Sequence, residues 1–290
     1  MKCVLATVLA IGSLLAPCAS QQADLEAELL TLEVLRQNPL RPELVNGQLY
    51  LIAQINSNDA AKALDKLVAK LPEAHRYIAI RALGLNESEE ATKALQRMAK
   101  DRGDLRMRRQ AIRVLASGDQ EDLDFLHNKR LKYESDLRVR ALILELLMNR
   151  GQPNLDKAFL TAAKSKDTVY AGVGLEGIGK QKIKAGLKII HGALGHQDVP
   201  YRLAAYEALA SYGGERQYAA IIEGLQDSIN VVVRPEIGAQ LQRAQTADEV
   251  SAVISHCMRS KDLGLVTLCV EALVVISAKQ PQLCSDALLE

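Results

Sequence analysis

Apolar positions recur along this chain with the spacing of amphipathic helices. Between residues 89 and 100, Ala91, Leu95 and Met98 are spaced four and then three residues apart, which places them on one helical face. Similar patterns cover six other stretches, at 59–71, 120–132, 154–164, 181–194, 216–225 and 247–258. The pattern predicts an all-α chain.

A second set of helices alternates with these stretches and returns every 30 to 33 residues. Each copy has a small residue near its centre, at Ala79, Ala111, Ala141, Ala171 and Ala204, with looser copies at Ile237 and Cys269. We interpret each repeat as a pair of helices. The helix with the central small residue comes first, and after a short turn one of the amphipathic stretches listed above forms the second helix. Because such a hairpin cannot bury its apolar face alone, neighbours must stack. We expect an α-solenoid of about eight antiparallel helix hairpins beginning near Pro42.

The residues before the repeats fall into two parts. Residues 21–41 contain an amphipathic stretch from Asp24 to Arg36, which we interpret as an N-terminal capping helix of the 42–290 solenoid. Residues 1–20 combine a single Lys2, an apolar run and small residues, as in a secretory signal peptide, with cleavage expected after Ser20. The run is shorter than the ~20 residues of a transmembrane helix. We therefore expect an exported chain, periplasmic or secreted, without a transmembrane segment once mature.

Two alternatives remain open for this N-terminus. The first is a buried N-terminal helix of the folded protein. The second is a lipoprotein, because Leu15-Ala16-Pro17-Cys18 resembles a bacterial lipobox and would leave a lipid anchor on Cys18. Pro17 departs from that motif, which has a small residue before the cysteine.

Composition defines the expected core and excludes one class of partner. The chain has 45 Leu and 39 Ala but only 3% aromatic residues and no Trp, so its core must be aliphatic. Without Lys2, the mature chain has 35 basic and 35 acidic residues and is formally neutral. Nucleic-acid binders normally carry a basic excess that neutralises phosphates. We therefore expect no nucleic-acid partner.

Three cysteines remain after the predicted cleavage, at Cys257, Cys269 and Cys284. In an antiparallel hairpin Cys257 would lie opposite Gly264, which offsets it from Cys269 by ~7 Å along the helix axis. That offset fits poorly with the Cα separation of a disulfide. We expect buried free thiols, although one disulfide stays possible in an oxidising compartment. The spacings also lack a CxxC zinc pattern.

Three neighbouring motifs resemble a HEAT repeat. They are Ala79-Ile-Arg-Ala-Leu-Gly84, Glu89-Glu-Ala-Thr-Lys-Ala-Leu95 and Asp101 at the next junction. The resemblance covers most of residues 42–278 and extends to the HEAT-like repeats of phycobilisome lyases. It implies an armadillo-like α-α superhelix, a fold that serves binding scaffolds and a few enzymes alike.

Within this repeat, a junction Asp is followed by an Arg and a small residue. The recurring pairs are Asp104 with Arg109, Asp136 with Arg138 and Asp198 with Arg202. We expect these residues to form a structural ladder between repeats.

No catalytic constellation is evident in the sequence. His191 and His196 are five residues apart, so they do not share a helical face as two metal ligands would. The chain lacks the His-Glu dipeptides of HEAT-like iron hydroxylases. The glycines from Gly172 to Gly179 have no preceding strand, so they indicate tight packing rather than a dinucleotide loop. We expect no enzymatic activity, no cofactor and no metal site.

Two groups of residues are candidates for partner binding. On the helix expected at 105–116, one face carries Arg106, Arg109 and Arg113. This face is either an ordinary solvated surface or a docking site for an acidic partner or an anionic envelope surface. A second group gathers in one repeat and is either core filler or a contact surface: Tyr206, Tyr212 and Tyr218, beside Tyr201.

These observations favour a non-catalytic scaffold that binds a protein partner along a concave surface formed by the second helices. The alternatives are a lyase-like enzyme or cofactor-handling protein, and a regulatory subunit of an envelope enzyme.

Overall fold

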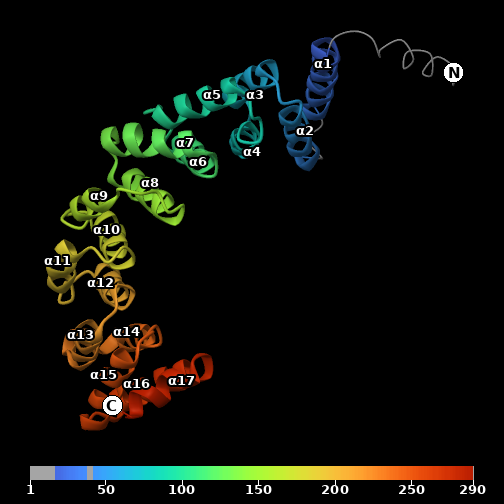
Figure 1. Cartoon of the computed structure of the whole chain (residues 1–290). Coiled ribbons are helices and arrows are strands. Elements are labelled where there is room, and N and C mark those ends of the chain that lie inside the picture. The colour runs from blue at the N-terminus through green and yellow to red at the C-terminus, as the bar shows by residue number, and fades with distance from the viewer. Residues whose placement is uncertain (1–16, 38–41, 290) are drawn as a thin grey trace. The chain divides into compact units, whose positions relative to one another are not determined.

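A computed structural model describes residues 17–37 and 42–289, and over these ranges the chain is helical without any β-strand (Figure 1). The predicted all-α repeat fold is confirmed. The chain divides into two compact units, Met1–Glu134 and Ser135–Glu290. The predicted export signal, residues 1–20, lies outside the described residues except for its last four, which begin the first helix. Over the described ranges, no helix has the length and apolarity needed to cross a bilayer.

The first unit contains seven α-helices within its described residues. They are α1 (Pro17–Arg36), α2 (Pro42–Gln54), α3 (Asn58–Lys70), α4 (Glu73–Leu83), α5 (Glu89–Lys100), α6 (Leu105–Ala116) and α7 (Gln120–Phe125), which continues into a π-helical turn at Leu126–Leu131.

The second unit continues the same alternation. Its α-helices are α8 (Leu137–Asn149), α9 (Asp156–Ala162), α10 (Thr168–Lys180), α11 (Leu187–Ala193), α12 (Val199–Tyr212), α13 (Glu215–Gln226), α14 (Arg234–Leu241), α15 (Ala247–Arg259), α16 (Leu263–Lys279) and α17 (Pro281–Leu289). Short 3₁₀ segments at Lys184–Gly186 and Ser228–Val233 precede α11 and α14.

Within each unit, the helices stack in two layers. Even-numbered helices, the predicted first helices, pack on one another: α4 lies against α2 and α6, and α12 against α10 and α14. Odd-numbered helices do the same, as α3 with α5 and α13 with α15. Stacking of equivalent helices buries the apolar faces that one hairpin leaves exposed.

In the first unit, the helices that pack most closely on each other are not the two that we predicted to form one hairpin. We expected α4 to pair with α5, but α4 packs more extensively on α3, and α5 on α6. The turn after α4 is held by the preceding repeat instead, because the Asn86 amide donates to the Ala53 carbonyl (3.2 Å) and the Glu87 N–H to Asn56 (2.7 Å). The sequence period is therefore correct, whereas the predicted pairing of α4 with α5 in one hairpin is not.

Aspartates fix where five of the even-numbered helices begin. In each case a carboxylate oxygen accepts a hydrogen bond from a backbone N–H in the first turn, as an N-cap does. The capping residues are Asp104 of α6, Asp136 of α8, Asp167 of α10, Asp198 of α12 and Asp262 of α16. Each such cap contributes about 1 kcal/mol, and their regular recurrence sets the start of the repeat.

The glycines of α10 lie where neighbouring atoms leave no room for a side chain. A Cβ atom on Gly174 would lie 2.3 Å from the Ala163 nitrogen, and one on Gly179 would lie 2.4 Å from the Ala208 carbonyl oxygen. At Gly177 it would lie 2.1 Å from the ring of Phe159. The predicted tight packing of this helix is confirmed, and no dinucleotide loop exists here.

One carboxylate, on Asp122 in the first turn of α7, opposes folding at neutral pH. Its Oδ1 is buried and finds no hydrogen-bond partner among the described residues. Burial, with smaller contributions from Asp119 and Glu121, raises the pKa of Asp122 to about 6. A pKa raised on folding means that stability is greatest below the unfolded-state value near 3.8 and falls as pH rises through 6.

Asp122→Asn is therefore expected to stabilise the protein above pH 7 and to have little effect near pH 4. The full shift corresponds to about 3 kcal/mol, which solvent screening of this half-buried group reduces to about 1 kcal/mol. Urea unfolding at pH 4 and pH 8 measures the difference. Asp248→Asn, at an exposed position, is the control. An equal effect of Asp122→Asn at both pH values would exclude this role.

Candidate functional site

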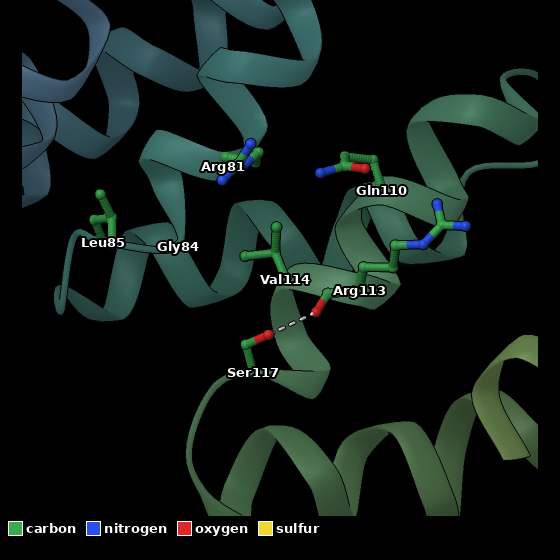
Figure 2. A pocket seen from close by; sticks show the side chains of 7 residues that line it. All are labelled: Arg81, Gly84, Leu85, Gln110, Arg113, Val114 and Ser117. Carbon is green, nitrogen blue, oxygen red and sulfur yellow. Dashed lines mark hydrogen bonds between the residues drawn. The ribbon is translucent and has the colours of Figure 1, made fainter. Parts of the chain in front are cut away.

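The predicted basic face of α6 borders a groove against α4. Two adjoining cavities, of about 340 and 280 Å³, share Gln110 and Arg113 in their walls. Figure 2 shows the larger one, with Arg81 and Leu85 approaching from the α4 side and Gln110, Arg113 and Val114 from α6. We call the two together the α4–α6 groove; its wall residues are Tyr77, Arg81, Gly84, Leu85, Arg106, Arg109, Gln110, Arg113, Val114 and Ser117.

One end of the groove is apolar and closely packed. A Cβ on Gly84 would lie 2.2 Å from Cγ1 of Val114, so glycine permits the close approach of α4 and α6 there. Leu85, immediately beyond, is 57% exposed. This end can accommodate an apolar side chain of a bound molecule.

The other end contains an exposed ion pair. The Arg106 guanidinium contacts the carboxylate of Glu73, which also accepts a hydrogen bond from the Tyr77 hydroxyl at 2.7 Å. The hydrogen bonds from Tyr77 and from Arg106 lower the pKa of Glu73. Arg106 is thus already paired, unlike the other arginines of the groove.

Arg81, Arg109 and Arg113 have no acidic partner within the described ranges. Nε of Arg109 is buried and makes no hydrogen bond there. Arg81 and Arg113 are exposed, and the Arg113 backbone carbonyl accepts from the Ser117 hydroxyl at 3.2 Å. Three guanidinium groups therefore line one groove without a carboxylate to neutralise them.

Arg81 was not predicted, although the repeat contains its signal. It follows Ala79 by two residues, just as Arg113 follows Ala111. Equivalent positions of successive repeats lie side by side when even-numbered helices stack. The repeat register therefore places Arg81 next to Arg113.

Other basic residues of this region have structural roles. Arg97 pairs with Asp65 on the surface, and Lys100 lies 5.1 Å from the centre of the Phe125 ring. Arg108 is buried, with its Nε 3.6 Å from Glu134, a buried carboxylate that also pairs with Arg130. The basic residues between positions 97 and 113 therefore belong to several separate features of the fold.

The predicted tyrosine contact surface is wrong for two of its three residues. Tyr206 is 2% exposed and Tyr218 is fully buried, so neither can touch a partner. The Tyr206 ring occupies space that exists because Gly224 has no side chain, since a Cβ there would lie 2.2 Å from the tyrosine hydroxyl. Tyr212 is half-buried. The Tyr206 and Tyr218 rings are core filler in a mostly aliphatic interior.

The contacts between repeats also join different residues from those predicted. Asp104 pairs with Arg76 of the preceding even helix (3.2 Å) rather than with Arg109, and the same kind of bridge joins Asp262 to Arg234 (3.3 Å). Asp198 accepts from the Thr168 hydroxyl at 3.3 Å. The aspartates are thus correctly placed at the junctions, but their partners lie about 28 to 30 residues earlier.

Of the arginines predicted for that ladder, Arg202 does contact the next repeat, but not through a junction aspartate. Arg202 is 3% exposed and donates from Nε to Asn230 (2.7 Å) and from Nη2 to the Ile229 carbonyl (3.2 Å). Through its backbone N–H, Arg138 donates to the capping carboxylate of Asp136 at 2.9 Å. The hydrogen-bond partners of a side chain depend on its neighbours in the folded protein, and the spacing of residues in the sequence does not identify these neighbours.

The described part of the chain contains no group of three or more His, Cys, Asp or Glu residues that could hold a metal ion. Cys257, Cys269 and Cys284 are free thiols, as expected, although only Cys269 is fully buried. Burial raises the pKa of Cys269 to about 12.

Comparison with known proteins places residues 60–148, from α3 to α8, among HEAT repeats. No curated protein matches the chain. Among solved structures, an engineered protein is similar over 94% of this chain and 85% of its own, with 20% identity and a TM-score of 0.43. Human deoxyhypusine hydroxylase in complex with glycerol is 15% identical, with 90% of this chain and 98% of its own covered and a TM-score of 0.37. A second engineered protein is 17% identical, with 75% of this chain and 96% of its own covered and a TM-score of 0.29. Residues 60–148 therefore resemble HEAT repeats, and over its described residues the chain is an all-α repeat protein.

Proposed function

We propose that this protein is a non-catalytic binding scaffold, exported from the cytoplasm, that holds an acidic segment of a protein partner in the α4–α6 groove. HEAT repeats commonly mediate protein–protein interaction. The single observation that carries the proposal is the set of three unneutralised arginines, Arg81, Arg109 and Arg113, along one groove. The exported location rests on the leader-like pattern of residues 1–20 alone.

The chemistry of the groove selects the kind of segment. Guanidinium groups bind carboxylates through paired hydrogen bonds, and these are stronger than bonds between neutral groups. Arg109 and Arg113 are one helical turn apart, ~6 Å along the axis. A partner with two carboxylates at that separation, followed by an apolar residue against Leu85 and Val114, matches both ends of the groove.

The binding surface differs in one respect from the expectation drawn from sequence. We expected the second helices to contact the partner, whereas the α4–α6 groove lies on two first helices. An enzymatic alternative would need convergent acid–base groups with shifted pKa values in a pocket. In this groove the unpartnered groups are arginines, which remain charged and are suited to binding.

A labelled peptide of about twelve residues, with glutamates one helical turn apart and one leucine, tests the proposal. Arg113→Glu is expected to weaken its binding to the full-length protein at least tenfold, because charge reversal replaces an attraction by a repulsion. Fluorescence anisotropy at constant ionic strength measures this.

Arg216→Glu makes the same charge change at an exposed residue of α13 and is the matched control. The proposal predicts less than a twofold effect there. It also predicts that the wild type binds the peptide more weakly as the salt concentration is raised from 50 to 200 mM. Equal losses in Arg113→Glu and Arg216→Glu would contradict it.

A further inference from the structure

Three turns of the second unit surround a separate polar cavity of about 280 Å³. They follow α10, α12 and α14, which are equivalent helices of successive repeats, so the turns meet at the same edge of the stack. Its wall has polar side chains from the helix ends and from the turns between them: Lys180 at the end of α10 and Lys182 after it, Ser211 in the last turn of α12, Arg243, Gln245 and Thr246 after α14, and Glu249 in the first turn of α15.

Glu249 holds two of these turns together. Its Oε1 accepts the Gly214 N–H, and its Oε2 accepts the N–H groups of Gln245 (2.7 Å) and Thr246 (3.3 Å). The side chain is 5% exposed. Because both oxygens accept hydrogen bonds from backbone N–H groups, this carboxylate links the two turns and is not available to bind a cation.

The cations in the wall outnumber this one carboxylate. Lys182 has no acidic partner among the described residues. Lys180 pairs with Glu176 at 2.7 Å, and Arg243 with Glu207 at 3.3 Å, but all four of these side chains are at least 32% exposed. Exposed pairs of this kind are weak, so both cations can exchange their partners for a ligand.

The backbone at Lys182 is unusual for its residue type. Its φ of +52° lies in the left-handed region, at the position after a helix where glycine is normally found. The Ile183 N–H donates to the Ile178 carbonyl at 3.0 Å, which completes the corresponding helix-ending motif. A lysine here strains the backbone, and its ammonium group makes no ion pair with any described residue. Strain of this kind is often found at functional sites.

We propose that this cavity binds a small phosphate-bearing anion. The ammonium groups of Lys180 and Lys182 and the guanidinium of Arg243 supply the charge, and the Ser211 hydroxyl supplies a further donor. A phosphate group presents several acceptor oxygens to these four donors, and the cavity volume accommodates it with a small substituent. This site lies in the second unit and does not depend on the α4–α6 groove.

Calorimetric titration of the full chain with inorganic pyrophosphate, at constant ionic strength in chloride, tests the proposal. We expect one saturable site in the wild type and at least a tenfold loss of affinity in Lys182→Gln. Lys184→Gln removes an exposed charge two residues away, outside the cavity, and is expected to change the affinity less than twofold. No saturable binding, or equal losses in the two variants, would overturn the proposal.

Lys182→Gly separates lost binding from lost folding. Glycine relieves the left-handed strain, so the melting temperature of the free protein is expected to rise by about 1–3 °C. Pyrophosphate affinity is expected to fall as it does in Lys182→Gln. Retained affinity in this stable variant would show that the lysine side chain is not part of the site.

Discussion

Gly177→Ala is expected to destabilise the second unit by about 3 kcal/mol, the upper end of the usual cost of overpacking a core. The new Cβ would lie 2.1 Å from Cδ1 of Phe159, whose side chain is fully buried. A rigid ring without free space beside it cannot move away, so α9 and α10 must separate. Thermal unfolding followed by circular dichroism should show a melting temperature lower by about 6–12 °C.

Gly172→Ala is the matched control on the same helix. The nearest atom to a Cβ there is Cβ of Ala204, at an ordinary contact distance of 3.7 Å. Since alanine favours helix over glycine, this variant should be more stable than the wild type by up to about 1 kcal/mol. Opposite signs for the two substitutions are the expected result. A loss in both, or in neither, would show that the close packing of α10 does not determine the stability of this unit.

Asn230→Ala is expected to cost about 3 kcal/mol, because one side chain satisfies three buried groups. The Asn230 amide donates to the Tyr206 hydroxyl (2.9 Å) and the Gly224 carbonyl (2.8 Å), while its oxygen accepts from Nε of Arg202 (2.7 Å). Among the described residues, the oxygens that accept hydrogen bonds from Arg202 are all carbonyl or amide oxygens, so its buried charge depends on these acceptors. Urea unfolding measures the loss.

A double-mutant cycle with Arg202→Met shows whether these groups act as one network. Arg202→Met removes the buried charge that depends on Asn230, so the double variant should lose clearly less stability than the sum of the two single losses. Losses that add to within about 0.5 kcal/mol would mean that Arg202 and Asn230 contribute independently.

The sequence was sufficient for features that depend on local periodicity. The helices and their 30 to 33 residue period follow from residues such as Ala79 and Ala111, and the helix starts follow from capping aspartates such as Asp104. The shared face of Arg109 and Arg113 is equally local. Arg81 could have been found by carrying the repeat register back from Arg113.

Features that depend on contacts between repeats could not be predicted from the sequence. The burial of Tyr206 depends on the missing side chain of Gly224, which belongs to the next helix. Arg202 turns inward to Asn230 instead of joining its junction aspartate. The second-unit cavity requires three turns to meet, and nothing in the local pattern around Lys182 indicates the other two.

A charge-exchange cycle between Arg113 and the acidic peptide tests whether the α4–α6 groove is the binding site. Arg113→Glu is titrated with the glutamate peptide and with a version in which one glutamate is replaced by lysine. If the two side chains touch, the lysine peptide should regain at least tenfold affinity for Arg113→Glu while binding the wild type more weakly than the original. If the lysine substitution weakens binding to both proteins equally, at every glutamate position, the groove does not hold the acidic segment.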